Sequence, residues 1–326
     1  MSAPEVARAI PGLVRDGVLP PTRAAPLLAV ARGELVSVRA ELRALLGLGV
    51  LLVTAGVGLF LKAHHEQIGP GAIAAGLALA AAGCLVAVAR RAPSFTWRRA
   101  PEPDWIVDGL SLLAVGLLGA ELAWIETQFT PLGSHWPWHL LAMSVVTGAL
   151  AMRFDSIAAW SLALSTFAAW RGVAVTAVGR GLERAVVGGE SELRWNLLVC
   201  ALVFALAGRA LERLDKKRHF EPATTFLAAL AASVALASGL GDVAWWFLWA
   251  LALAALGGLV ARHAFARRRL ALFALGALAL YAGATRFLFE LPGAFGLGCF
   301  WFAMSSVGAV VLLVAVHRRF RAGGEP

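Results

Sequence analysis

Charged residues are scarce in this 326-residue sequence, making up 15% of the chain, while 60% of the residues are hydrophobic. A soluble domain usually has about 25% charged and about 45–50% apolar residues. A water-soluble fold of this length buries only a fraction of its surface and has no room inside for so much apolar material. The composition therefore excludes an ordinary soluble protein and favours a lipid environment.

Cysteines and catalytic motifs are also missing. The three cysteines, Cys84, Cys200 and Cys299, are scattered in apolar segments and form no CxxC pair, which excludes a disulfide framework and a thiolate zinc site. The sequence has no phosphate-binding GxxxxGK[ST] loop, no HExxH, no GxSxG nucleophile and no CxxCH haem motif. These absences favour a protein that is not an enzyme, and we expect no cofactor.

What the chain does contain is a series of long apolar runs. A helix needs about 20 apolar residues to cross the hydrocarbon core, and these runs lack the alternation of a barrel strand. The sequence thus predicts an all-α, polytopic transmembrane helical bundle of about ten spans within residues 44–317. The predicted spans are 44–62, 70–89, 107–126, 138–153, 155–173, 195–210, 222–240, 243–261, 269–288 and 296–316.

Residues 1–43 are polar and basic, and they predict a small cytoplasmic helical region. A first helix is expected from Pro4 to Arg15, the pairs Asp16-Gly17 and Pro20-Pro21 end it, and a second helix starts near Thr22. Residues 318–326 are expected to form a short basic cytoplasmic tail. The N-terminal region is a candidate contact for a cytoplasmic protein partner.

The basic residues indicate the orientation. With both termini in the cytoplasm, 23 of the 29 Lys and Arg residues fall on inside segments, as expected for a protein of the inner (plasma) membrane with an even number of spans. The net charge of +9 is spread over short clusters between apolar runs. Nucleic-acid binding would need a continuous basic face, so the lipid bilayer, and no nucleic acid, is the expected partner.

The N-terminal third contains a short polar turn, a glycine-rich apolar run and a second polar turn: Asp16-Gly17-Val18-Leu19-Pro20-Pro21, then residues 48–60, then His64-His65-Glu66-Gln67-Ile68-Gly69-Pro70. With these motifs, roughly residues 10–90 resemble the DUF2157 family of predicted bacterial membrane proteins. The resemblance implies a short soluble helical piece followed by membrane spans. It implies no established activity and carries over no catalytic residues.

Three charged residues within or beside predicted spans are candidates for a substrate or ion pathway. Glu121 lies about two-thirds of the way through the third span, and Arg286 and Glu290 are four apart near the end of the ninth. Intramembrane charges are costly unless they are paired or hydrated. Arg286 is expected to pair either with Glu290 on the same helix face or with Glu121 across helices.

Four histidines, His64, His65, His135 and His139, are expected on the outer side of the membrane. His135 and His139 have the spacing of ligands on one helical turn, although Pro137 between them disfavours a regular helix. Two interpretations stay open: an outer metal or proton site that includes these residues, or ordinary histidines in interfacial loops.

The leading functional hypothesis is a transporter-like or permease-like protein for a small solute or lipid-like substrate, because the chain combines many spans with intramembrane Glu121 and Arg286. The alternative is a non-transporting scaffold, sensor or accessory subunit that contacts a cytoplasmic partner through residues 1–43. A membrane enzyme that acts on lipid with outer His and Glu residues is a third hypothesis.

Overall fold

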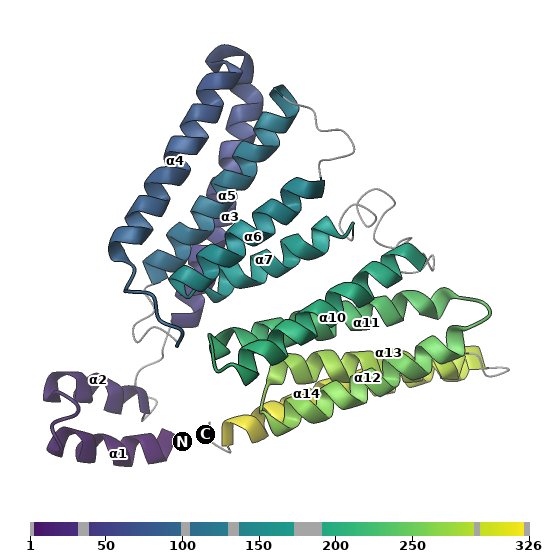
Figure 1. The fold of residues 1–326 in the computed structure, drawn as a ribbon. Coiled ribbons are helices and arrows are strands. Elements are labelled where there is room, and N and C mark those ends of the chain that lie inside the picture. The colour runs from purple at the N-terminus through teal and green to yellow at the C-terminus, as the bar shows by residue number, and fades with distance from the viewer. Residues whose placement is uncertain are drawn as a thin grey trace. The chain divides into compact units, whose positions relative to one another are not determined.

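The computed structural model describes residues 3–31, 39–98, 105–129, 137–172, 191–289 and 294–322, and in these ranges the chain is helical without β-strands. The chain divides into two compact units, one formed by residues 1–42 and 250–326 and the other by residues 43–249. Figure 1 shows the helices of both.

The unit of residues 43–249 holds most of α3 (Arg39–Ile68), which begins just before the unit's boundary, and then α4 (Pro70–Arg91), α5 (Trp105–Gln128), α6 (Pro137–Phe154), α7 (Ile157–Trp170), α10 (Ser191–Arg213), the short helix η2 (Arg218–Phe220), α11 (Glu221–Ala237) and η3 (Ser238–Gly241). The other unit holds α1 (Ala3–Arg15), α2 (Pro21–Ala31), most of α12 (Trp246–Ala266), α13 (Leu270–Phe289) and α14 (Ala294–Ala322).

Among the residues that the structure describes, six helices are long and apolar enough to cross a membrane: Pro70–Arg91, Ile106–Gln128, Ser191–Arg213, Arg218–Gly241, Trp246–Ala266 and Leu270–Phe289. Two shorter apolar helices, Trp138–Phe154 and Ile157–Trp170, coincide with the predicted fourth and fifth spans. Helices α3 and α14 cover the predicted first and last spans. The all-helical membrane architecture is confirmed, while the count of ten spans and the cytoplasmic placement of the termini stay predictions.

The connections between helices follow from local sequence. Gly69 has a φ of +80°, a conformation that glycine adopts readily. Pro70 follows at the start of α4, a position at which proline is favoured. Between α6 and α7, Asp155 has a φ of +62°, and the Ser156 hydroxyl accepts a hydrogen bond from the Ala159 N–H as the N-cap of α7. These residues produce tight helical hairpins.

Two apolar clusters form the core of the larger unit. Between α4 and α5, Ile73, Leu77, Ala81 and Leu117 are buried together. Between α7, α10 and α11, the buried residues are Leu164, Leu193, Leu197, Cys200, Ala201, Phe204, Ala228, Ala231 and Ala235. Many other apolar side chains on these helices are exposed, as expected where lipid is the solvent.

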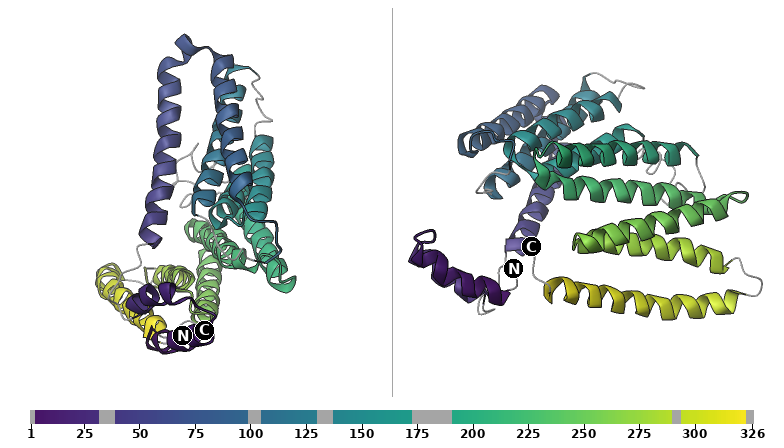
Figure 2. Two further views of the ribbon diagram at one scale, coloured as in Figure 1. Left: turned by 90° about the vertical axis from the view of Figure 1, so that its left-hand side faces the viewer. Right: turned by 60° about the horizontal axis from the view of Figure 1, so that its bottom comes forward.

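Helices α12 and α13, which are drawn in green to yellow-green in Figure 2, are in backbone contact. A Cβ added to Gly257 would stand 2.3 Å from the Leu280 backbone nitrogen, and one added to Gly276 would stand 2.5 Å from the Ala261 nitrogen. Further along, one added to Gly283 would stand 2.6 Å from the Ala250 oxygen. Only glycine permits this approach, which is the small-residue packing of membrane helices.

In the same unit, the Tyr281 and Ser305 hydroxyls share a hydrogen bond of 2.9 Å between α13 and α14. Helices α1 and α2 form a hairpin whose turn contains Gly17 with a φ of +71°. The predicted first helix, Pro4–Arg15, is confirmed as α1, and α2 is described as far as Ala31.

Candidate functional site

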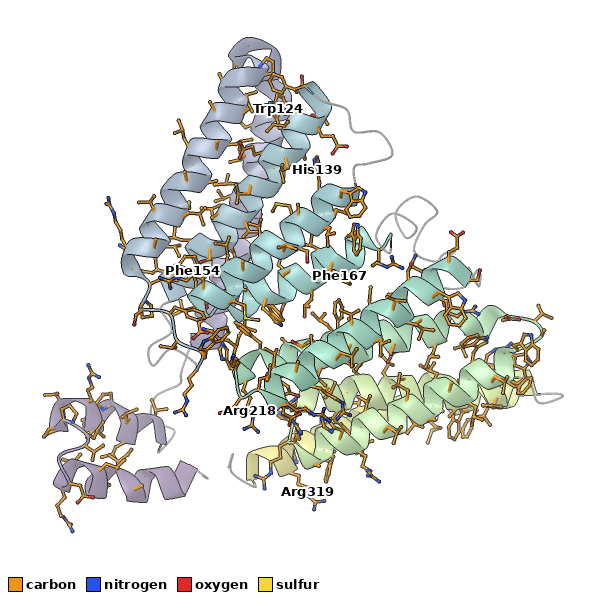
Figure 3. The ribbon with its side chains drawn as sticks, viewed as in Figure 1. Trp124, His139, Phe154, Phe167, Arg218 and Arg319 are labelled. Atoms are coloured by element: carbon orange, nitrogen blue, oxygen red, sulfur yellow. The ribbon has the colours of Figure 1, made fainter. Side chains whose placement is uncertain are left out.

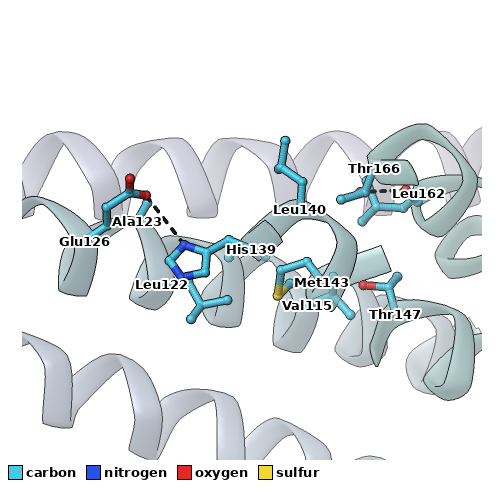
Figure 4. A pocket seen from close by; sticks show the side chains of 12 residues that line it. Val115, Leu122, Ala123, Glu126, His139, Leu140, Met143, Thr147, Leu162 and Thr166 are labelled. Atoms are coloured by element: carbon cyan, nitrogen blue, oxygen red, sulfur yellow. Dashed lines mark hydrogen bonds and ion pairs between the residues drawn. The ribbon is translucent and has the colours of Figure 1, made fainter. Parts of the chain in front are cut away.

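Helices α5, α6 and α7 line a half-open cavity of about 330 Å³ in the unit of residues 43–249. Figure 4 shows it from close by. Its walls are mostly apolar, with a few polar groups among them. The lining residues are Val115, Gly116, Gly119, Leu122, Ala123 and Glu126 from α5, His139, Leu140, Met143 and Thr147 from α6, and Leu162 and Thr166 from α7.

Small residues on α5 leave the space. Gly116, Gly119 and Ala123 recur at intervals of three and four residues, so they share one face of the helix. A Cβ on Gly119 would stand 3.8 Å from the Met143 methyl carbon, so Met143 is the nearest side chain across that face. Methionine is flexible and adapts to what it packs against. The cavity therefore has one side chain that can move aside for an occupant.

One end of the cavity carries an acid–base pair. The Glu126 carboxylate lies 3.6 Å from Nδ1 of His139, and both side chains are half-buried. The dashed line in Figure 4 joins these two atoms. A carboxylate and an imidazole are polar groups that can orient a ligand between mostly apolar walls. Glu126 comes near the end of α5 and His139 in the first turn of α6, which places the pair at one end of both helices.

The other end of the cavity carries hydroxyl groups. The Thr166 hydroxyl donates a 2.8 Å hydrogen bond to the Leu162 carbonyl in its own helix. The Thr147 hydroxyl is different, because the residue is 1% exposed and its oxygen has no hydrogen-bond partner among the described residues. A buried hydroxyl without a partner costs free energy that a bound polar group would recover. Thr147 is thus available to an occupant of the cavity.

Glu121, a predicted pathway residue, is half-buried on α5 and does not line this cavity. It is four residues after Leu117 and three before Trp124, both of which pack in the α4–α5 cluster, so it shares their face of the helix. Arg286 is half-buried on α13 in the other unit, and Glu290 lies outside the described residues. The pairing of Arg286 with either carboxylate stays a prediction.

Of the four predicted outer histidines, only His139 has a described side chain. His64 and His65 lie in α3 with side chains outside the description, and His135 lies outside the described residues. Within the described part of the chain, no three His, Cys, Asp or Glu side chains are grouped closely enough to hold a metal ion. His139 instead meets Glu126, which is not among the predicted site residues.

A second polar cluster joins two helical hairpins. Asp155, in the α6–α7 turn, binds the Lys217 ammonium through Oδ1, and the same oxygen lies 3.1 Å from Nε2 of His219 in the α10–α11 connection. Lys217 is only 2% exposed. The sequence did not predict the Asp155–Lys217 contact, which joins residues 62 positions apart. The cluster ties α6–α7 to α10–α11 at their shared end.

Arg194 is buried at the start of α10. Its guanidinium donates to the Ser238 carbonyl at 3.3 Å and lies 4.3 Å from the centre of the Trp249 ring. Asp242 is 3.9 Å away. Gly239 leaves the room that Trp249 needs, because a Cβ there would stand 2.3 Å from the indole. The guanidinium is fully engaged in fixing the η3 turn.

Apolar helices long enough to span a bilayer, with buried polar groups between them, define a multi-pass helical membrane protein. Within that class, residues 11–160 match the model of the DUF2157 family, described as a predicted membrane protein, and this confirms the resemblance noted in the sequence. The match begins within α1 and extends through α2 and the following helices to the start of α7, including most of the cavity lining. No curated protein and no solved structure matches the chain.

Proposed function

We propose that this protein binds a small amphipathic solute in the α5–α6–α7 cavity and carries it across the membrane. The observation that supports the proposal is the cavity itself, which combines apolar walls, the Glu126–His139 pair at one end and the unpartnered Thr147 hydroxyl. Ligand sites are typically apolar clefts of about 300–1,000 Å³ with a few polar groups that orient the ligand. At about 330 Å³, this cavity suits a small molecule.

The axis of the cavity runs along the membrane helices. His139 and Thr147 are eight residues apart on α6, which corresponds to about 12 Å at 1.5 Å per residue. An elongated solute would therefore lie parallel to the helices, with one polar group at the acid–base pair and another at Thr147.

The basic-residue distribution supports both termini in the cytoplasm of a cell with this protein in its inner membrane. In that orientation, the acid–base pair lies toward the outer side and Thr147 deeper in the membrane. Transport then requires that Thr147 become accessible from both sides in turn, and this requirement gives a test that needs no knowledge of the solute.

The test uses Thr147→Cys in a background in which Cys84, Cys200 and Cys299 are replaced by alanine. A membrane-impermeant thiol reagent is applied to intact cells and, separately, to inverted membrane vesicles. We expect labelling from both sides, and we expect Met143→Trp, which fills the cavity, to slow it at least about tenfold. Ser111→Cys is the matched control, since Ser111 is equally buried but does not line the cavity.

Labelling of Thr147→Cys from one side alone would contradict transport and leave a binding pocket. No labelling from either side would contradict the binding site as well. Ser111→Cys should stay unlabelled in both preparations, because Ser111 is buried and does not line this cavity.

A second function is supported by the α1–α2 hairpin, which exposes apolar side chains, Val18 at 71% among them. We propose as the alternative that this hairpin docks a cytoplasmic protein. Deletion of residues 3–31 distinguishes the two proposals. A docking role predicts that the cellular phenotype is lost while two-sided labelling of Thr147→Cys persists, and a role in transport itself predicts that the labelling changes.

A further inference from the structure

The segment that follows α4, residues 92–98, has a defined shape because other connections hold its backbone. We name it the basic–aromatic loop. The Lys217 N–H donates a 2.7 Å hydrogen bond to the Trp97 carbonyl, and the Arg153 guanidinium donates one of 3.2 Å to the Pro93 carbonyl. The Thr96 hydroxyl bonds the Arg98 carbonyl within the loop. Three helix connections of the same unit thus meet at one end of their helices.

Two aromatic rings of the basic–aromatic loop face outward. Phe95 and Trp97 pack edge to face with ring centres 5.0 Å apart, yet they are 43% and 52% exposed. The Lys216 ammonium lies 4.4 Å from the centre of the Trp97 ring, and that of Lys217 lies 5.1 Å from the Phe95 ring. Aromatic rings beside ammonium groups are typical of the interface between hydrocarbon and water.

Among the described residues around this loop, the exposed charges are mostly positive. The exposed cations there are Arg90, Arg91, Arg98, Arg153, Lys216 and Arg218. Asp155 does not offset them, because it is engaged by Lys217 and His219, and Asp215 is the exposed acid in the adjoining turn. A surface with this balance attracts anions.

The position of the loop indicates which anions it meets. It directly follows the last turn of α4, a 22-residue apolar helix, and it packs against the connections that end α6 and α10. In Figure 3, Phe154 and Arg218 mark two of these connections. When such helices span the hydrocarbon core, their ends lie in the headgroup layer. There, basic residues are attracted to acidic phospholipids.

From this arrangement we infer that the basic–aromatic loop, together with Lys216 and Arg218, forms a binding surface for acidic phospholipid headgroups. The rings of Phe95 and Trp97 lie at the level of the ester groups, and the cations around them contact the phosphates. The inference is independent of the proposed transport.

The test measures the association of spin-labelled phosphatidylglycerol, relative to spin-labelled phosphatidylcholine, with the full-length protein in phosphatidylcholine vesicles. We expect the wild type to prefer phosphatidylglycerol. The double variant Lys216→Gln/Arg218→Gln should lower that preference by up to about thirtyfold at low salt, given the typical attraction per basic residue. Both side chains are exposed, so the fold should tolerate the change.

The matched control is Arg262→Gln/Arg267→Gln, which removes the same charge from exposed positions near the end of α12. It should keep most of the preference. Equal losses in the two double variants would overturn the inference in favour of a general charge effect, and so would an unchanged preference in the first. Displacement of the lipid by millimolar glycerol phosphate would also overturn it, by identifying a site for soluble anions.

Discussion

Helices α12 and α13, in the unit of residues 1–42 and 250–326, meet backbone to backbone at Gly257, Gly276 and Gly283. The hairpins α6–α7 and α10–α11, in the unit of residues 43–249, are linked instead by the buried charges of Asp155 and Lys217. Lipid is as apolar as the helix surfaces, so the hydrophobic effect gives little reason for helices to associate. Close packing and polar contacts between helices take the place of the hydrophobic effect. In this molecule the close packing lies mainly along the helices, and the polar contacts lie at their ends.

The two modes should respond differently to small changes. A backbone contact tolerates no added atom but has no charge to lose. A buried ion pair tolerates a change of shape at its edge but leaves an uncompensated charge when one partner is removed. Three variants test this contrast, two with a control of the same type and the third in a double-mutant cycle.

The largest effect is expected for Asp155→Asn. Asparagine adopts the left-handed conformation readily, so the φ of +62° at this position is preserved and the variant removes charge alone. Lys217 then keeps a buried ammonium without its carboxylate, and breaking such a pair typically costs about 3–5 kcal/mol. We expect a loss of about 3 kcal/mol in the free energy of unfolding, measured by titrating the protein in mixed micelles with a denaturing detergent.

Asp215→Asn is the control for this loss. Asp215 also has a positive φ, of 52°, and is exposed, so its substitution should change the free energy by less than about 0.5 kcal/mol. Equal effects of the two variants would show that the Asp155–Lys217 link does not contribute to stability.

Gly257→Ala tests the backbone contact. The new methyl group would stand 2.3 Å from the Leu280 nitrogen, and overpacking of this kind typically costs about 1–3 kcal/mol. Gly258, the next residue, has nothing within 4 Å of an added Cβ, so Gly258→Ala should gain up to about 1 kcal/mol from helix propensity. The same titration should show opposite signs for the two neighbours; the same sign for both would contradict the close approach of α12 and α13.

Neighbouring glycines also show where sequence reasoning stops. Membrane helices were predictable because apolar runs of this length must satisfy their backbone hydrogen bonds internally in lipid. Which glycine of the pair Gly257-Gly258 faces α13 depends on the rotation of α12 about its own axis. The identity of the two residues does not predict that rotation. The confirmed part of the prediction is therefore the part that depends on local composition.

The candidate site was harder to predict for the same reason. Glu126 has the sequence environment of a solvated helix end, and only the packing of α6 beside α5 brings His139 to it. Asp155 and Lys217 are 62 residues apart. Both have positive φ angles, which the sequence did not predict. The sequence indicated Glu121 because a carboxylate within a predicted span is unusual. The cavity is formed by small residues, which give no such signal in the sequence.

The smallest effect is expected for Trp160→Phe, which tests a polar link without charge. The Trp160 indole N–H donates a 2.8 Å hydrogen bond to the Thr224 hydroxyl, joining α7 to α11, and its ring stacks on Phe220 at 5.3 Å. Phenylalanine keeps an aromatic ring at this position and loses the donor. Thr224 still donates to the Phe220 carbonyl, so the hydroxyl keeps one partner.

Because phenylalanine is also smaller than tryptophan, the hydrogen bond is best isolated by a double-mutant cycle with Thr224→Val. Hydrogen bonds between membrane helices contribute on average about 0.6 kcal/mol, and we expect a coupling energy of that size. A coupling near zero would mean that aromatic packing alone joins α7 to α11. A coupling as large as the loss in Asp155→Asn would remove the distinction between charged and neutral links on which the comparison of the two helix contacts depends.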